Sequence, residues 1–339
     1  MKELRNRQWL LARRPTGTAE VEDFAFRETT FSVPELAPGQ VLIKNSIFLL
    51  APTIRNWMDA PGNNFYPSIP IGAPVLSPAG GQVVASADPR FPVDSRVSAI
   101  SSWQDYEVVD TTERSVRLMP DGASAVDAMG PLGMNALTAY FGLVRLGRPM
   151  VGESLVVSGA AGSAGSTAAQ IGKVMGCRVV GIAGGPQKCE WLVSECGLDA
   201  AIDYKSGSLA EQLAKACPDG IDVFFDNVGG ATLQAAVDSM ARFGRIVLCG
   251  QIAGYDNSVP IPGPQNMMRL IYGSIQMRGF LLADFEEELA EGWHYLGAWL
   301  RDGVLVHRED VRSGFASIPQ SFPALFDGSN AGTLLVTAD

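Results

Sequence analysis

Short apolar runs, interrupted by proline and glycine, dominate the first 125 residues of the chain. Residues 40–44, 81–85 and 106–109 are examples, and each run has only four or five positions. Runs of this length that contain β-branched residues and end at turn-forming residues are typical of strands joined by loops. The pattern therefore predicts a β-rich region at the start of the chain.

From about residue 126 the pattern changes to apolar strands that alternate with helical segments. Residues 154–158 and 178–183 predict two strands, separated by a glycine-rich turn and a helix that ends near residue 176. Continuous apolar strands between helices are typical of a parallel sheet covered on both faces. Further along, the pattern predicts a helix over 188–196 and strands over 223–228, 245–249 and 277–282.

The end of the chain returns to the earlier pattern. Residues 332–337 form a β-like run after a turn at 330–332, and we expect this strand to rejoin the first domain. The length of 339 residues fits two domains of about 150 residues each. The predicted organisation is a β-rich domain of residues 1–125 and 306–339, with an α/β domain of residues 126–305 inserted in it.

The most informative motif is the turn Gly159-Ala-Ala-Gly162-Ser-Ala-Gly165, which follows a predicted strand and opens a predicted helix. In that context glycines permit a tight turn, a close approach to a pyrophosphate and close packing of the helix on the strand. The start of the helix offers free N–H groups to phosphates. The segment 162–165 is therefore predicted to bind a dinucleotide.

The residues after the second predicted strand indicate which dinucleotide is bound. An NAD site usually has an acidic residue there for the ribose hydroxyls, but this chain has Gly184-Gly185-Pro-Gln-Lys188. Two glycines let the backbone approach an anion, and Lys188 places a positive charge beside it. This favours the extra phosphate of NADP. The alternative is that Lys188 is a solvated lysine at the start of a helix.

Other polar residues fall where strand ends of such a sheet would meet a ligand. They are Tyr204, Asn227, Cys249 and Tyr255. Each has an ordinary structural alternative, because asparagine and tyrosine in loops are often turn or cap residues.

Composition excludes several other functions. The net charge of −10 and the lack of a basic run argue against nucleic-acid binding. No signal peptide or stretch long enough to span a bilayer is evident, so we expect a cytoplasmic protein. His294 and His307 are the only histidines, and the five cysteines include no C-x-x-C pair. We therefore expect no metal site, and we interpret Cys177 and Cys249 as small core residues.

Seven segments spread over nearly the whole chain carry a more specific signal. In order and separation they resemble the zinc-independent medium-chain dehydrogenase/reductases, and within them the leukotriene B4 dehydrogenase/prostaglandin reductase family of NADPH-dependent alkenal/one reductases. These segments are 6–9, 159–165, 183–189, 225–230, 244–250, 279–282 and 328–336.

The resemblance implies a Rossmann domain inserted in a β-rich, GroES-like catalytic domain, a homodimer and NADP(H) as cofactor. Lys188 and Tyr204 match positions that hold the adenosine 2′-phosphate, and Tyr255 matches the tyrosine that binds the substrate carbonyl. Cofactor contacts are implied for Gly162, Ser163, Ala164, Gly165, Gly185, Lys188, Tyr204, Asn227, Cys249, Phe280, Leu282 and Asn330.

One segment departs from the family pattern. Family members commonly read Asp-Pro-Tyr-Met-Arg where this chain has Ala51-Pro-Thr53-Ile-Arg55. Thr53 replaces a tyrosine that can line the substrate pocket, so we expect the shape of that pocket to differ. Arg55 is expected to be structural or to face the cofactor, without a catalytic role.

The implied reaction is reduction of the carbon–carbon double bond of an α,β-unsaturated aldehyde or ketone. Hydride adds to the β-carbon, and Tyr255 is the candidate donor that stabilises the enolate oxygen. Two alternatives stay open: an NADPH-dependent quinone reductase on the same scaffold, and a non-catalytic NADPH-binding protein.

Overall fold

The computed structural model describes residues 3–62, 68–256 and 261–339. Within it the chain divides into two compact units. Residues 1–129 and 309–339 form one unit, and residues 130–308 form the other. Val306 belongs to the second unit because its N–H and its carbonyl both bind the Gln170 side chain, at 2.8 Å each.

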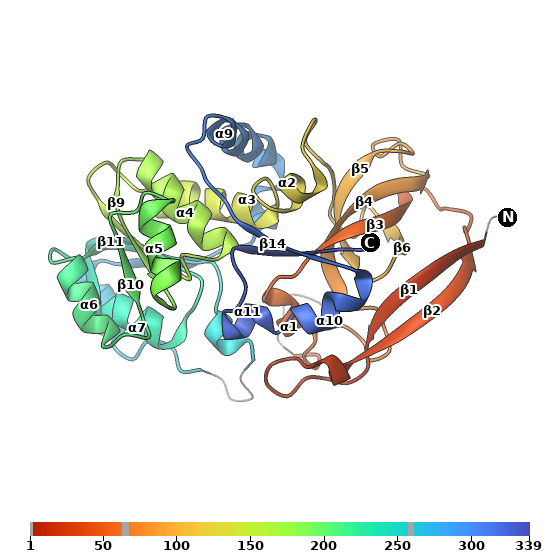
Figure 1. Cartoon of the computed structure of the whole chain (residues 1–339). Coiled ribbons are helices and arrows are strands. Elements are labelled where there is room, and N and C mark those ends of the chain that lie inside the picture. The colour runs from red at the N-terminus through yellow and green to blue at the C-terminus, as the bar shows by residue number, and fades with distance from the viewer. Residues whose placement is uncertain (1–2, 63–67, 257–260) are drawn as a thin grey trace. The chain divides into compact units, whose positions relative to one another are not determined.

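The first unit is built on a β-sheet to which both ends of the chain contribute (Figure 1). Its described strands run in the order β14-β15-β3-β4-β5-β7, with β6 also paired to β3, while β1 and β2 form a separate antiparallel ribbon. Because β15 pairs with β3, the last strand of the chain is bonded to one of the first. The elements are β1 (Glu3–Leu11), β2 (Phe24–Ser32), β3 (Gln40–Leu49), α1 (Thr53–Trp57), β4 (Leu76–Ser86), β5 (Arg96–Ser102), β6 (Tyr106–Asp110), β7 (Val116–Leu118), α2 (Ala125–Met129), β14 (Glu309–Ser313), α10 (Ile318–Ser321), α11 (Ala324–Asp327) and β15 (Thr333–Thr337).

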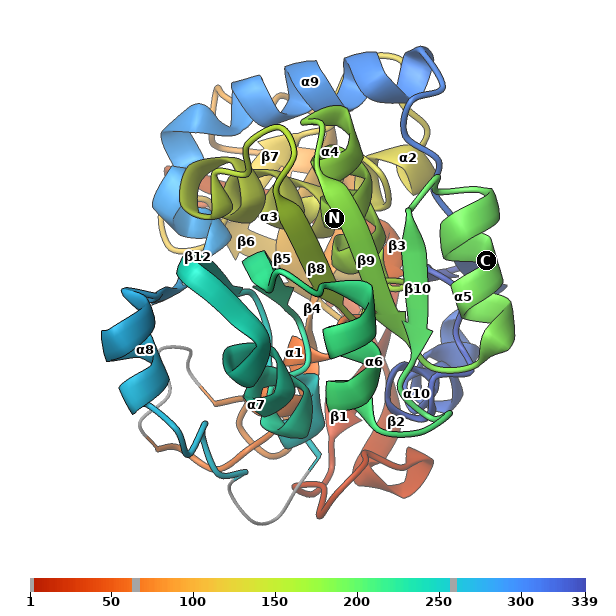
Figure 2. The same ribbon diagram turned by 90° about the vertical axis from the view of Figure 1, so that its left-hand side faces the viewer.

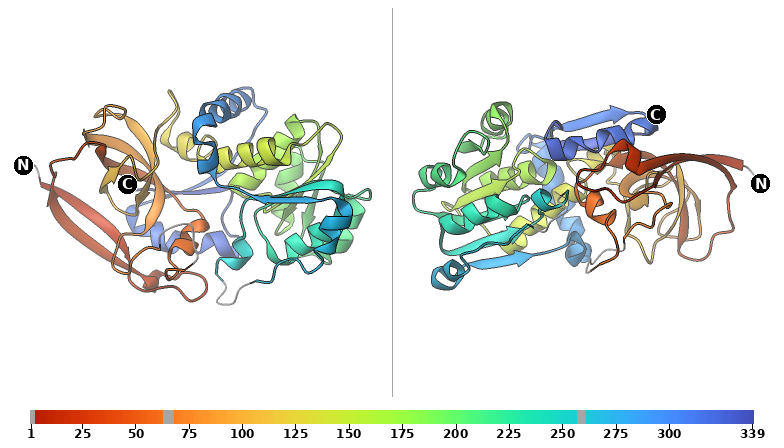
Figure 3. Two further views of the ribbon diagram at one scale, coloured as in Figure 1. Left: turned by 180° about the vertical axis from the view of Figure 1, so that it is seen from behind. Right: turned by 90° about the horizontal axis from the view of Figure 1, so that it is seen from below.

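The second unit is a parallel sheet with helices on both faces (Figures 2 and 3). Its described strands follow the order β10-β9-β8-β11-β12-β13, which reverses direction between β8 and β11. This is the Rossmann order. The elements are α3 (Met134–Phe141), the π-helix η2 (Gly142–Gly147), β8 (Ser154–Ser158), α4 (Ser163–Val174), β9 (Arg178–Ala183), α5 (Pro186–Ser194), β10 (Ala200–Asp203), α6 (Leu209–Ala216), β11 (Ile221–Asp226), α7 (Gly230–Ser239), β12 (Met240–Leu248), η3 (Ile252–Gly254), α8 (Met268–Gly273), β13 (Gln276–Gly279), η4 (Leu282–Glu288) and α9 (Leu289–Arg301).

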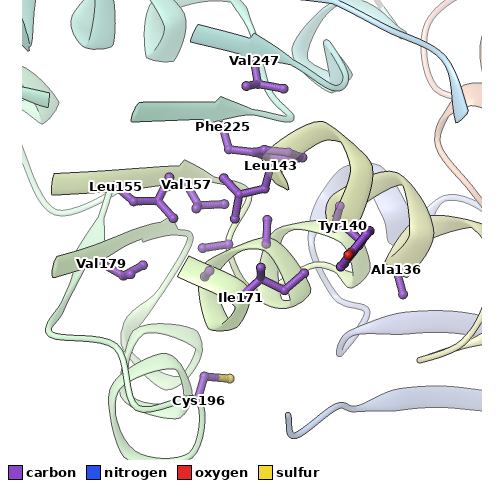
Figure 4. Close-up of a cluster of buried hydrophobic side chains, with 14 of the residues drawn as sticks. Ala136, Tyr140, Leu143, Leu155, Val157, Ile171, Val179, Cys196, Phe225 and Val247 are labelled. Atoms are coloured by element: carbon purple, nitrogen blue, oxygen red, sulfur yellow. The ribbon is translucent and has the colours of Figure 1, made fainter. Parts of the chain in front are cut away.

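Alternate residues of the central strands pack into two separate hydrophobic cores in this unit, one on each face of the sheet. Leu155 and Val157 of β8 join the cluster on the α3–α4 side (Figure 4), whereas Val156 between them joins the cluster on the opposite face. All three side chains have no exposed surface. Inner residues of a strand that is buried on both faces pack against apolar groups on either side, which is why Leu155–Val157 form an unbroken apolar run in the sequence.

The α/β fold class predicted from the pattern is confirmed, but some strand bounds were wrong. The run 223–228 ends as a strand at Asp226, because the Asp226 carboxylate accepts hydrogen bonds from the N–H groups of Val228 and Gly229 and turns the chain. The run 277–282 ends as a strand at Gly279, because its apolar residues Phe280 and Leu282 pack into the core instead of extending the sheet. No helix within the described ranges has the length and apolar character needed to cross a membrane.

Candidate cofactor and substrate site

Most of the sequence-predicted site residues lie along one edge of the parallel sheet. Strand pairing aligns Ser158 with Ile182, Ala183 with Asp203, and Asp226 with Leu248, so neighbouring strands end together. In a doubly wound sheet, ligands bind at the carboxyl edge, where the strand order reverses. The segments that leave this edge are 159–165, 184–188, 204–205, 227–230, 249–255 and 280–282.

The glycine turn packs the start of α4 tightly against the end of β8. A Cβ atom added to Gly165 would lie 2.2 Å from the Gly159 carbonyl oxygen, so no side chain fits there. Gly159 itself has a φ of +58°, a left-handed conformation that favours glycine. Helix α4 begins at Ser163 after Gly162, and no side chain caps it. This close, uncapped helix start fits the pyrophosphate of a dinucleotide.

Asn227 is fixed beside this turn by Ser158. The Asn227 Nδ2 donates to the Ser158 carbonyl at 2.7 Å, and the Asn227 N–H donates to the Ser158 Oγ at 2.8 Å. A Cβ at Gly159 would lie 3.4 Å from the Asn227 Cβ. The structure therefore brings Asn227 to the glycine turn across the β8–β11 boundary.

A buried carboxylate underlies this contact. Asp226 has 0% of its surface exposed, and its Oδ1 accepts hydrogen bonds from Ser158 Oγ at 2.7 Å and from the N–H groups of Val228 and Gly229 at 3.1 Å. Burial raises the pKa of Asp226 above its ordinary value, and these hydrogen bonds act in the opposite direction. Neither Asp226 nor Ser158 was predicted from the sequence as a site residue.

Gly184, Gly185 and Tyr204 meet at the adjacent ends of β9 and β10. A Cβ at Gly184 would lie 2.9 Å from a ring carbon of Tyr204, so the ring covers this glycine. The Asp203 carboxylate accepts the N–H groups of Gly185 at 2.9 Å and Lys205 at 3.0 Å, which lowers its pKa. Asp203 thus organises the turn that leads into α5.

Lys188 lies in the first turn of α5, where it is partly buried. The exposed fraction of Tyr204 is 50%. Two glycines, a lysine and an exposed ring therefore share one end of the sheet, a set that can surround a phosphate on a ribose.

The loop after β12 folds back on itself and returns Tyr255 to the strand end. The hydroxyl oxygen of Tyr255 accepts the Gln251 N–H at 3.1 Å. A Cβ at Gly250 would lie 3.5 Å from that oxygen and 3.3 Å from the Asn227 carbonyl oxygen. Tyr255, Cys249-Gly250 and Asn227 are therefore brought together at the ends of β11 and β12.

Phe280 and Leu282 lie at the end of β13, the edge strand of the sheet. Leu282 is buried, and Phe280 is half-buried against the same core. Between them, Leu281 N–H donates to Asp284 Oδ2 at 3.0 Å, which starts the η4 turn.

Thr53, Asn330 and Arg55 belong to the other unit. Thr53 opens α1 and is partly buried, and Asn330 Nδ2 donates to the Gly332 carbonyl at 2.9 Å. Arg55 is 3% exposed and donates to the carbonyls of Gly17 and Pro15 at 2.8 and 3.1 Å. These bonds give Arg55 a structural role, while the roles predicted for Thr53 and Asn330 stay predictions.

All five cysteines are free thiols. Burial raises the pKa of Cys177 to about 11 and those of Cys196 and Cys249 to about 12. Cys189 and Cys217 are shifted in the same direction by the same cause. Within residues 3–62, 68–256 and 261–339, no three side chains of His, Cys, Asp or Glu are grouped so as to hold a metal ion.

Two family models match the chain. The N-terminal domain of oxidoreductase matches residues 7–116, and the zinc-binding dehydrogenase model matches residues 164–296. The first match lies in the β-rich unit, and the second covers most of the parallel sheet.

Characterised relatives match over almost the whole length. The chain is 36% identical to the NADPH-dependent curcumin reductase of Escherichia coli, over 98% of this chain and 96% of that protein. It is 33% identical to prostaglandin reductase 1 of Bos taurus (98% and 99% covered) and 32% identical to the NADP(+)-dependent 2-alkenal reductase of Nicotiana tabacum (99% and 98% covered).

A solved structure agrees with these relatives. CurA from Vibrio vulnificus in complex with NADPH superposes with a TM-score of 0.89 at 35% identity, covering 98% of this chain and 99% of that one. The fold and the glycine turn thus define an oxidoreductase of the medium-chain dehydrogenase/reductase type. The chain belongs to the zinc-independent family that includes the curcumin, prostaglandin and 2-alkenal reductases, so the family prediction is confirmed.

The buried Asp226 gives a pH-dependent stability that can be measured. Its native pKa lies above the unfolded value of about 4. The native state therefore holds a proton that the unfolded state has lost, and the free energy of unfolding falls as pH rises through this window. Urea unfolding from pH 4 to 7 should show the wild type losing stability relative to Asp226→Asn as pH increases.

The Asp203→Asn variant supplies the contrast. Because hydrogen bonds lower the pKa of Asp203, the wild type should gain stability relative to this variant as pH rises toward about 4. If the free energy of unfolding of the wild type, relative to that of Asp226→Asn, stays constant or increases with pH, then burial does not raise the pKa of Asp226.

Proposed function

We propose that this protein is an NADPH-dependent reductase of the carbon–carbon double bond of α,β-unsaturated aldehydes and ketones. The observation that carries the proposal is the return of the Tyr255 hydroxyl to the ends of β11 and β12, beside Gly250 and Asn227. A donor at that edge of a Rossmann sheet is placed to act on a substrate next to the reactive end of a dinucleotide. The names of the relatives support the same reaction class.

Different residues along the sheet edge have different roles in binding the cofactor. The turn at Gly162–Gly165 presents the start of α4 to the pyrophosphate, and Asn227 flanks that turn. When bound, NADPH supplies the hydride that adds to the β-carbon of the substrate.

The substrate oxygen gains negative charge as its β-carbon is reduced. Tyr255 donates its hydroxyl proton in a hydrogen bond to that oxygen, which stabilises the enolate. The Gln251 N–H meanwhile holds the Tyr255 oxygen from the other side, at 3.1 Å. The α-carbon then takes a proton from Tyr255 or from water, and this completes the saturated product.

A Tyr255→Phe variant tests this assignment. Loss of a lone oxyanion donor costs about 2–4 kcal/mol in the barrier, so kcat with an enone should fall about 30- to 10³-fold. Initial rates of NADPH oxidation with linear enals, enones and quinones measure it. The Kd for NADPH should stay within about two-fold of the wild-type value, because the ring position is retained.

Tyr295→Phe is the matched control, since Tyr295 lies on α9 and stacks with Tyr140. Its turnover should match the wild type. Unchanged enone turnover in Tyr255→Phe would remove Tyr255 from the mechanism. Activity with quinones alone would favour a quinone reductase, and tight NADPH binding without turnover of any acceptor would favour a binding protein.

Lys188 and Tyr204 are proposed to hold the 2′-phosphate of the cofactor. The charge of Lys188 is worth about 1.5–3 kcal/mol in a hydrogen bond to a phosphate. Lys188→Ala should therefore raise the Kd for NADPH about ten-fold or more and leave the Kd for NADH unchanged. Lys215→Ala on α6 is the control for the loss of an exposed positive charge. An equal loss of affinity for both cofactors would rule out 2′-phosphate recognition.

We also propose that two copies assemble through the edge of the parallel sheet. In the described structure β13 is paired only with β12, and Ile271 and Tyr272 on neighbouring α8 are 69% and 79% exposed. An unpaired edge beside exposed apolar side chains favours association. A second copy of the chain fits this edge, because two β13 strands that pair antiparallel are related by a two-fold axis, as the subunits of a dimer are.

Analytical ultracentrifugation tests the assembly. Ile271→Asp should shift the protein from dimer to monomer, because it buries a charge in the proposed interface. Val151→Asp, at a turn residue that is 85% exposed, should leave the sedimentation unchanged. A wild-type protein that sediments as a monomer would refute the proposal.

A further inference from the structure

A rare helical form, a π-helix, contacts the residue that follows strand β13. Helix α3 continues without a break into the π-helix η2, Gly142–Gly147. The Arg148 N–H closes it with a bond to the Leu143 carbonyl at 2.7 Å, and Arg148 has a φ of +42°. π-Helical turns are infrequent and often mark functional sites, because they reposition the residues around them.

Gly142, the first residue of the π-helix, makes room for an aromatic ring. A Cβ at this position would lie 2.4 Å from Cζ and 2.8 Å from Cε1 of Phe280. Its φ and ψ of −58° and −43° suit any residue, so the backbone does not require glycine. The requirement comes from the Phe280 ring, which fills the space a side chain would take.

The surroundings determine which neighbour would move if Gly142 had a side chain. The same Cβ would lie 3.0 Å from Cε2 of Phe225, a β11 residue with 0% exposure (Figure 4). Phe225 is fully buried in the close-packed core, so it has less room to shift than Phe280. Phe280 is half-buried at the end of an edge strand, where Phe285 contacts it edge-to-face at 6.2 Å. Added bulk at Gly142 would therefore displace Phe280.

The backbone after Phe280 is fixed, so a displaced ring would strain it. Leu281 N–H donates to Asp284 Oδ2, and Asp284 N–H donates to the Leu281 carbonyl, both at 3.0 Å. Phe280 is thus anchored on one side by Gly142 and on the other by this turn. We propose that Gly142 is a positioning residue that seats Phe280 and so sets the backbone of 280–282 against the nicotinamide end of the cofactor. This rests on the proposed function and on the family resemblance, in which residues 280–282 match a segment that lines the nicotinamide.

Gly142→Ala tests the proposal in the full-length protein. The Kd for NADPH should rise about ten-fold or more, because the backbone of 280–282 would no longer be pre-organised for the cofactor. Binding is followed by NADPH fluorescence, and thermal unfolding is recorded alongside. The second variant is Gly142→Ala/Phe280→Leu, in which the smaller side chain removes the clash. It should bind NADPH within about three-fold of Phe280→Leu alone, a non-additivity expected of residues in contact.

Gly147→Ala is the control from the same π-helix. Its Cβ would meet Leu143 at 3.1 Å and Val223 at 3.3 Å, so it crowds the core and should lower stability while leaving the Kd unchanged. An unchanged Kd in Gly142→Ala, or an equal rise in Gly147→Ala, overturns the role of Gly142. If Gly142→Ala does not fold, a double variant that also fails to bind overturns it. A wild type that does not bind NADPH overturns the proposed function instead.

Discussion

The arrangement of the parallel sheet depends on one buried carboxylate. Asp226 accepts hydrogen bonds from Ser158 on the neighbouring strand and from two N–H groups at the start of α7. A buried charge is costly unless it is satisfied, so these donors have to be present together. Their positions join β8 to β11 where the strand order reverses, and Asn227 follows directly. The glycine turn and Asn227 are therefore held in one fixed arrangement, and the neighbouring strands end beside it.

Electrostatics at this edge follow from where each carboxylate lies. Asp203 is partly exposed and is satisfied by backbone N–H groups, so its charged form is favoured. Asp226 is fully buried, and desolvation outweighs its hydrogen bonds. Both carboxylates bind protein donors of the turns beside them. Because protein donors satisfy both carboxylates, the edge can contain acidic residues and still bind an anion at the start of α4, which has no side-chain cap.

Sequence patterns predicted the strands better than the contacts between them. Apolar runs located β8 and β9 to the residue, because the interior of a doubly buried strand packs apolar side chains on both faces. The buried Ser158 at the end of β8 is an exception, and its hydroxyl donates to Asp226. The glycine spacing located the turn at 159–165, because a Cβ at Gly165 would lie 2.2 Å from the Gly159 carbonyl oxygen and only glycine tolerates that packing. The seat of Phe280 on Gly142 was missed because it joins residues 138 positions apart, and no local pattern encodes such a contact. Asp226 was missed because a polar residue at the end of a strand resembles an ordinary turn residue.

The state of the cysteines has a consequence for chemical durability. α,β-Unsaturated carbonyls are electrophiles that alkylate thiolates, and neutral thiols react far more slowly. Burial raises the pKa of all five thiols and so favours their protonated form, including that of Cys249, which lies at the same sheet edge as Tyr255. A thiolate at that edge would be open to alkylation by substrates of the class proposed above. The raised pKa values therefore make these thiols less reactive toward electrophilic carbonyl compounds.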